Sequence, residues 1–80
     1  MKKFIVDKIK IIEDKDFKYI GIYDEKDNDW YKEQKKFDSE TLKVMYNKDS
    51  LLVLSTSKDV SVLAPTMVGD VVEEIEYQEV

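Results

Sequence analysis

The chain has 80 residues and a formal net charge of −5, and it contains neither cysteine nor histidine. A length of this order fits one small domain. Without histidine and cysteine the chain lacks the usual general base near neutral pH, the common nucleophile–base pairs and the usual zinc ligands. Its two glycines are too few for a glycine-rich phosphate loop. We therefore expect a non-enzymatic protein that uses no cofactor and no metal.

The charges are unevenly distributed. All thirteen basic residues are lysines, and the last of them is Lys58. Arginine grips phosphates and guanine edges in bidentate fashion, so its absence argues against specific nucleic-acid recognition. The segment after Lys58 carries no base and six acids, which are Asp59, Asp70, Glu73, Glu74, Glu76 and Glu79. This acidic end fits either an ordinary solvated strand or a surface for a basic partner.

No apolar run approaches the roughly 20 residues that cross a membrane. The first residues also lack the long apolar core of a signal peptide. A reducing cytoplasm is therefore the expected compartment.

The N-terminal quarter of the chain predicts two strands. Residues 3–12 are rich in isoleucine and valine, which favours a strand. Their alternation slips between Val6 and Ile9, so a bulge and a short helical turn entering the strand both remain open. After a polar turn, residues 17–23 form a second strand with aromatic residues on odd positions. Gly21 interrupts that face, which indicates a bulge or the close approach of another side chain.

A short helix is expected within residues 28–37. Trp30, Gln34 and Phe37 lie at i, i+4 and i+7 after good N-cap residues, so they form one helical stripe. We interpret Trp30 and Phe37 as anchors that pack the helix on a sheet. An exposed aromatic patch that includes Tyr31 is the alternative. The charged residues of the helix should face water; they are Lys32, Glu33, Lys35 and Lys36.

Residues 40–56 predict a β-hairpin, because two runs rich in β-branched, aromatic and aliphatic residues flank a polar turn at residues 47–50. In the first arm Leu42, Val44 and Tyr46 share one face, which indicates a half-buried strand. The second arm has four apolar residues in a row at 51–54. This pattern predicts a strand inside a sheet with both faces covered.

The remaining residues predict one more strand. Residues 60–65 cross the domain and end at the only proline, and Gly69 permits a turn. Val71, Ile75 and Tyr77 then share one face of a last strand, with Glu74 and Glu76 facing water or a partner. The whole chain, residues 1–80, is thus expected to be a single α+β domain: a small antiparallel sheet of four or five strands with one short helix.

Five segments, taken together and in order, carry a resemblance to a known family. They are residues 21–25, 28–33, 37–46, 58–65 and 71–73. They give a strand ending in acidic residues, a Trp-Tyr helix start, an acid-Thr-aliphatic-Lys-aliphatic strand, an Asp-x-Ser-x-Leu-x-Pro segment and an acidic valine strand. Over roughly residues 19–75 the chain resembles the N-terminal region of tail fibre assembly proteins from lambdoid bacteriophages and prophages.

The resemblance implies a small viral chaperone that binds the C-terminal, receptor-reading region of a trimeric tail fibre. It would help the fibre fold or trimerise in the host bacterial cytoplasm, and some such proteins stay attached to the virion. An exposed sheet edge or an aromatic patch around Trp30 and Tyr31 would contact the fibre. Typical members continue into a charged, helical C-terminal half, whereas this chain ends at Val80. A minimal fibre-binding module, a truncated relic and a domain recruited to another phage task all remain open.

A second hypothesis comes from the acidity of the chain. It is a phage-encoded inhibitor of a host defence complex that acts by protein–protein binding. The acidic last strand, with Glu74 and Glu76, would then serve as a decoy for a basic nucleic-acid channel.

Overall fold

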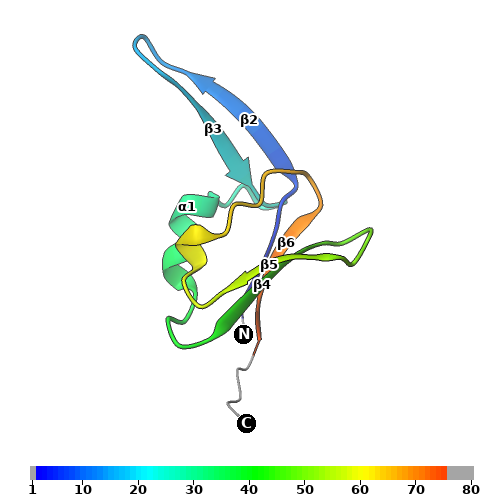
Figure 1. The fold of residues 1–80 in the computed structure, drawn as a ribbon. Coiled ribbons are helices and arrows are strands. Elements are labelled where there is room, and N and C mark those ends of the chain that lie inside the picture. The colour runs from blue at the N-terminus through cyan, green and yellow to red at the C-terminus, as the bar shows by residue number, and fades with distance from the viewer. Residues whose placement is uncertain (1, 76–80) are drawn as a thin grey trace.

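The computed structural model describes residues 2–75 and contains two antiparallel sheets (Figure 1). The larger sheet has the strand order β1–β6–β4–β5, with bounds Lys3–Ile5, Asp70–Ile75, Leu42–Asn47 and Val53–Ser57. The smaller sheet pairs β2 (Lys8–Glu13) with β3 (Lys18–Tyr23). A helix, α1 (Trp30–Glu33), runs into the 3₁₀ helix η1 (Gln34–Lys36), and a second 3₁₀ helix is η2 (Val60–Val62). This arrangement confirms the predicted α+β class with an antiparallel sheet and one short helix.

The first apolar stretch forms two strands in two different sheets. The Val6 N–H donates to the Asp70 carbonyl at 2.9 Å, which continues the pairing of β1 with β6. The Asp7 N–H donates to the Tyr23 carbonyl, also at 2.9 Å, which begins the pairing of β2 with β3. The slip in the apolar alternation after Val6 therefore marks a change of sheet, whereas a bulge or a helical turn was expected.

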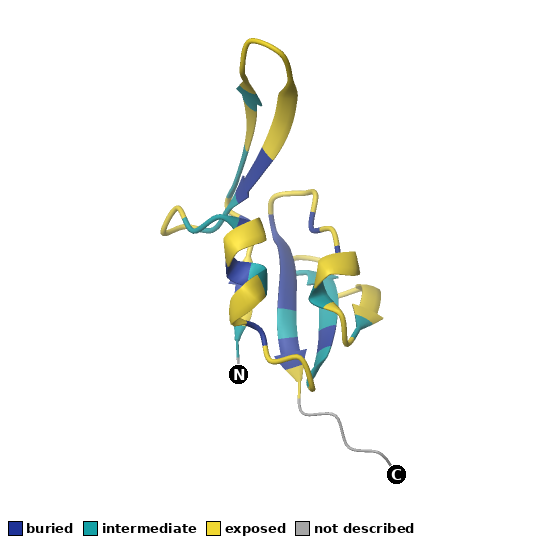
Figure 2. Cartoon of the chain, turned by 90° about the vertical axis from the view of Figure 1, so that its left-hand side faces the viewer, coloured by how far each residue is buried: buried dark blue, intermediate teal, exposed yellow. Residues whose placement is uncertain are grey.

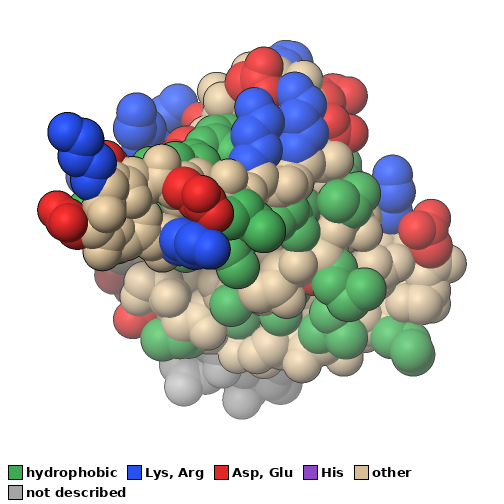
Figure 3. Space-filling view, turned by 90° about the horizontal axis from the view of Figure 1, so that it is seen from above, with side chains coloured by type: hydrophobic (Ala, Val, Ile, Leu, Met, Phe, Trp, Pro, Cys, Tyr) green, Lys and Arg blue, Asp and Glu red, His purple; other side chains and the backbone are tan. Residues whose placement is uncertain are grey.

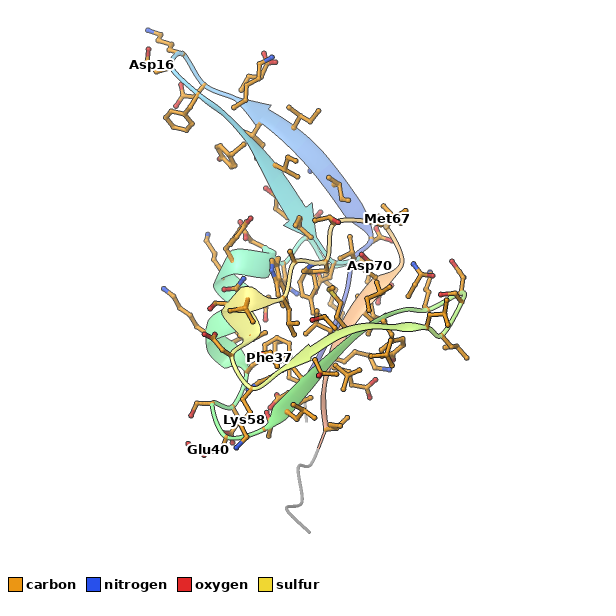
Figure 4. All side chains as sticks on the ribbon, viewed as in Figure 1. Asp16, Phe37, Glu40, Lys58, Met67 and Asp70 are labelled. Carbon is orange, nitrogen blue, oxygen red and sulfur yellow. The ribbon has the colours of Figure 1, made fainter. Side chains whose placement is uncertain are left out.

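β2 and β3 form a regular hairpin that projects from the body of the molecule, which we call the hairpin arm (residues 8–23; Figures 1 and 4). Asp16 lies at its tip. The Tyr23 ring lies against Gly21, and a Cβ at residue 21 would lie only 2.6 Å from Tyr23 Cε2. Of the two alternatives predicted for Gly21, the structure shows the close approach of a side chain, and the strand pairing there has no bulge.

The core lies between one face of the larger sheet and the α1–η1 segment, as the buried residues in Figure 2 show. Trp30 is 1% exposed and packs against Phe4 and Phe37, with ring centroids 5.0 Å and 6.0 Å away. The helix begins there because the Asp29 carboxylate accepts a hydrogen bond from the Tyr31 N–H at 2.8 Å. The prediction that Trp30 and Phe37 anchor the helix is confirmed.

Glu33 is an exception to the expectation that the charged helix residues face water. It is buried, and its carboxylate pairs with Lys2 Nζ at 2.7 Å and with Lys36 Nζ at 3.2 Å. The hydrogen bond from Lys2, helped by that from Lys36, outweighs the effect of burial and holds the pKa of Glu33 below its usual value. Lys32, Lys35 and Lys36 are exposed as expected.

The hairpin of β4 and β5 is confirmed, but the interior position expected for its second arm is wrong. β5 is the last strand of the larger sheet, and its outer edge has no partner strand within residues 2–75. Leu51 and Leu52 precede β5. Leu54 is an extra residue in β5, a bulge at the point where the register with β4 shifts between Met45 and Tyr46. The side chains that were expected to be covered are exposed: Leu51 by 71%, Leu52 by 67%, Val53 by 62% and Leu54 by 54%.

The chain then passes over the body and returns as the central strand β6. Pro65 is buried on this path, and Gly69 adopts a φ of +94°, which confirms the predicted turn. Val71 is buried and Ile75 is partly exposed, whereas Glu76 and Tyr77 lie outside the described residues. Within residues 2–75 no helix is long and apolar enough to cross a membrane.

Candidate binding surface

The aromatic patch expected around Trp30 and Tyr31 is not formed. Trp30 is enclosed in the core, whereas the neighbouring Tyr31 is 59% exposed. Consecutive residues at the start of a helix point in different directions, so the cap that fixes Trp30 inward also turns Tyr31 outward. Of these two residues only Tyr31 could touch a partner.

Glu74 does not face water or a partner, so that expectation is wrong. It is 5% exposed and lies on the core face of β6, opposite Lys43. Its carboxylate accepts hydrogen bonds from Thr41 Oγ1 at 2.6 Å, from the Lys2 N–H at 3.0 Å and from the Asp38 N–H at 3.2 Å. Burial alone would raise the pKa of Glu74, but these hydrogen bonds outweigh it and hold the pKa below its usual value. Glu76, the other acidic residue expected at this surface, lies outside the described residues.

Lys43 is a buried charge that the sequence pattern did not identify. It is 1% exposed, and its ammonium group donates to the main-chain carbonyls of Asp38, Thr41 (2.8 Å) and Lys58 (2.6 Å). These bonds join the two chain segments at one end of the β4–β5 hairpin, where Figure 4 shows Glu40 and Lys58 close together. An ammonium group with three carbonyl acceptors is satisfied internally, so Lys43 is a structural residue and offers nothing to a ligand.

A surface hollow is lined by charges of both signs. It lies beside β1, has a volume of about 430 Å³, and is lined by both lysines and acidic residues. Asp24, at its rim, already accepts hydrogen bonds from the N–H groups of Lys26 and Asn28 and from the Asn28 side chain. Nowhere in residues 2–75 do three acidic residues gather in a way that could hold a metal ion. The hollow therefore has no evident ligand.

Within residues 2–75, two groups of exposed apolar side chains could bind another protein. The first, which we call the edge surface, consists of Leu51, Leu52, Val53 and Leu54 beside the open edge of β5. The second is the hairpin arm, where the exposed apolar residues are Ile11, Phe17, Tyr19 and Ile20. Seen from above, apolar side chains lie exposed across the molecule, with charged groups around them (Figure 3).

The edge surface combines apolar side chains with unpaired main chain. Residues 50–57 contain no charged residue, so nothing on this strand opposes the burial of its edge. The turn that leads into it is fixed, because the Leu51 N–H donates to the Asn47 carbonyl at 2.8 Å and Leu51 adopts a φ of +59°. A strand from another protein could hydrogen-bond to such an edge and pack on the leucines.

No protein-family model matches the chain, and no significant match occurs among curated proteins.

Proposed function

We propose that this chain is a phage tail fibre assembly factor: a non-enzymatic, chaperone-like protein that binds the C-terminal region of a tail fibre in the host bacterial cytoplasm. The observation that carries the proposal is the edge surface, four consecutive large apolar side chains exposed beside the unpaired outer edge of β5. Exposed apolar patches and open edges are typical of surfaces that bind other proteins. The resemblance over residues 19–75 supplies the identity of the partner.

In this proposal an unassembled fibre strand adds to the outer edge of β5. Main-chain hydrogen bonds would give affinity for an extended segment, and Leu52 and Leu54 would cover apolar side chains of the fibre. Such contacts would protect the fibre from aggregation until its own subunits replace them. The contact is apolar, so its affinity should depend only weakly on salt.

The acidic-decoy hypothesis receives no support from the carboxylates of β6. Asp70 is 3% exposed, and its oxygens accept from Asn47 Nδ2 and from the Met67 N–H. Glu73 accepts from the Tyr46 hydroxyl at 2.7 Å, and Glu74 is buried in its own network. Asp70 and Glu74 are therefore buried, and the partly exposed Glu73 is hydrogen-bonded within the molecule, so the carboxylates of β6 are poorly placed to imitate a nucleic-acid backbone.

A capture experiment with two matched variants tests the proposal. The variants are Leu52→Asp on the edge surface and Val62→Asp on η2, whose parent side chains are 67% and 65% exposed. Each immobilised protein is incubated with lysate of phage-infected cells, and the captured proteins are identified by mass spectrometry. We expect the wild type and Val62→Asp to retain a tail fibre protein in high salt, and Leu52→Asp to lose it.

Two results would contradict the proposal. One is that the wild-type protein captures no fibre protein from lysate in which the fibre is abundant. The other is that Leu52→Asp retains the fibre as well as Val62→Asp does, which would move the binding site away from the edge surface.

A further inference from the structure

We propose that the hairpin arm is a dimerisation element, in which two copies of this chain pair antiparallel along the free edge of β2. The resulting assembly would contain a continuous four-stranded sheet, β3–β2–β2–β3. This surface is separate from the edge surface, so the inference does not depend on the proposed function.

The hairpin arm is a two-stranded sheet, several of whose apolar side chains are not packed against another part of the described chain. Ile11 is 73% exposed and Ile20 is 56% exposed on one face, and Phe17 and Tyr19 are exposed by 57% and 50% on the other. A two-stranded hairpin alone is marginally stable in water, and three or more strands are usually needed. Neither β2 nor β3 pairs with a third strand in the described part of the chain.

The free edge of β2 is regular. Lys8 to Glu13 pair with β3 in one continuous register, without the shift that interrupts β5. The Asp14 N–H donates to the Phe17 carbonyl at 2.9 Å, so by alternation Ile12 and Lys10 also direct their main-chain groups toward β3. Ile9, Ile11 and Glu13 then direct theirs outward, toward an added strand.

The charges along β2 indicate that the added strand is β2 of a second copy of the chain. Lys10 lies nearer the body and Asp14 lies nearer the tip, so an antiparallel copy can place these opposite charges side by side. A two-fold axis through the sheet at Ile12 sets Ile12 against Ile12, and Lys10 of each copy against Asp14 of the other. These six side chains share one face, and two Lys–Asp pairs flank the isoleucine contact.

Neighbouring registers are less favourable. A two-fold axis at Lys10 would place the Lys10 ammonium groups of the two copies opposite each other, and these like charges repel. An axis at Ile11 retains only Lys8 opposite Asp14, and Lys8 already pairs with Asp27 at 2.5 Å. The register centred on Ile12 also extends an apolar row, because Tyr19 lies opposite Ile12 within each hairpin arm.

The projection of the hairpin arm makes this pairing sterically simple. The arm projects from the body (Figure 1). With the axis at Ile12, about midway between the base and the tip of the arm, the two bodies would lie at opposite ends of the shared sheet. The tip of each arm then reaches the base of the other. There the turn before β6 is held to Val6 by the Gly69 N–H at 2.9 Å and exposes Met67 by 65% (Figure 4).

Two charge reversals test both the partner and the register. In a Lys10→Glu homodimer the introduced carboxylate would face Asp14 of the other copy, and in an Asp14→Lys homodimer Lys10 would face the introduced ammonium group. We expect each variant to weaken dimerisation by at least roughly tenfold, because like charges opposed across a strand pair repel. An equimolar mixture of the two variants restores both opposite-charge pairs, so it should dimerise like the wild type. The double variant Lys10→Glu/Asp14→Lys should do so alone.

Sedimentation equilibrium of the purified full chain gives the readout, with circular dichroism and the emission of the buried Trp30 as checks of folding. Lys35→Glu and Asp49→Lys, alone and mixed, are the matched controls, since both positions are exposed outside the hairpin arm; neither should change dimerisation. A monomeric wild type would overturn the proposal. So would a dimer that both reversals leave unchanged, or a mixture that stays monomeric although each variant is folded.

Discussion

At the scale of single residues, Trp30 carries the packing of the helix on the sheet. Trp30→Ala should lower the free energy of unfolding by about 3–5 kcal/mol, because it leaves a cavity between Phe4 and Phe37. Urea denaturation followed by circular dichroism measures this loss. Tyr31→Ala, which removes an exposed ring from the adjacent position, is the control and should change stability by less than about 0.5 kcal/mol. Equal stability of the two variants would contradict the assignment of Trp30 as an anchor.

Glu74 should make stability depend on pH. Its pKa is lowered in the folded protein from an ordinary value of 4.5, so the carboxylate stabilises the fold fully above that value. This contribution is lost as the pH falls through the folded-state pKa. Glu74→Gln should cost about 1–3 kcal/mol at neutral pH, because an amide nitrogen would face donors such as the Lys2 N–H.

The difference in unfolding free energy between wild type and Glu74→Gln should therefore shrink as the solution is acidified below pH 4.5, the ordinary pKa of the carboxyl group. Urea denaturation across a pH series measures it. A difference that is constant with pH, or a variant as stable as the wild type at pH 7, would show that the carboxylate is not engaged as the structure has it.

The sequence predicted single residues well where spacing alone decides the outcome. Trp30 and Phe37 lie one helical stripe apart, and their burial follows from that spacing. Glu74 and Lys43 could not be predicted in this way. The hydrogen-bond partners that make their burial tolerable come from residues 2, 38, 41 and 58, which are distant in sequence from one or both of them. Of the predicted partner contacts, only Tyr31 is left on the described surface.

At the scale of elements, β5 behaves as an exposed edge in the folded monomer. Leu54→Asp should change the free energy of unfolding by less than about 0.5 kcal/mol, because the leucine is already solvated. Leu63→Asp, at a residue that is 2% exposed, is the contrast and should unfold the domain or cost several kcal/mol. Thermal and urea denaturation compare the two. A large loss on Leu54→Asp would mean that β5 is covered in the isolated protein.

Strand composition predicted both arms of the β4–β5 hairpin, and Gly21 indicated two alternatives, of which the structure shows the close approach of a neighbouring ring. What composition could not supply was the identity of each strand's neighbours. An apolar run such as residues 51–54 indicates that burying these side chains would be favourable, but it does not say which strand lies beside them. In the larger sheet β6 and β1 lie on the other side of β4, so no strand of the described chain covers the outer edge of β5. The sequence likewise does not show which strands neighbour residues 3–12, so these residues were predicted as one strand although they contribute to two sheets.

At the scale of the whole molecule, the protein has a compact body and a thin hairpin arm. Its radius of gyration is 13.3 Å and its extents are 51 × 26 × 20 Å, whereas a compact domain of this length should have a radius of gyration of about 12 Å. We expect amide hydrogen exchange to be at least roughly tenfold faster at Ile12 and Tyr19, which hydrogen-bond within the arm, than at Val44 and Val72, because local opening is easier where apolar contacts are few. Dilute protein, in which the proposed dimer dissociates, is the appropriate sample. Uniform protection across all strands would contradict a weakly held arm.

The strand order has a consequence for how fast the chain can fold. β6 follows every other strand of the larger sheet in sequence, yet it lies between β1 and β4 and pairs with both. More than sixty residues therefore separate β1 from its partner β6 in the sequence. Closing so long a loop slows the formation of the native strand pairing. During synthesis the β2–β3 and β4–β5 hairpins can form early from local contacts. The larger sheet can close only after β6 has left the ribosome.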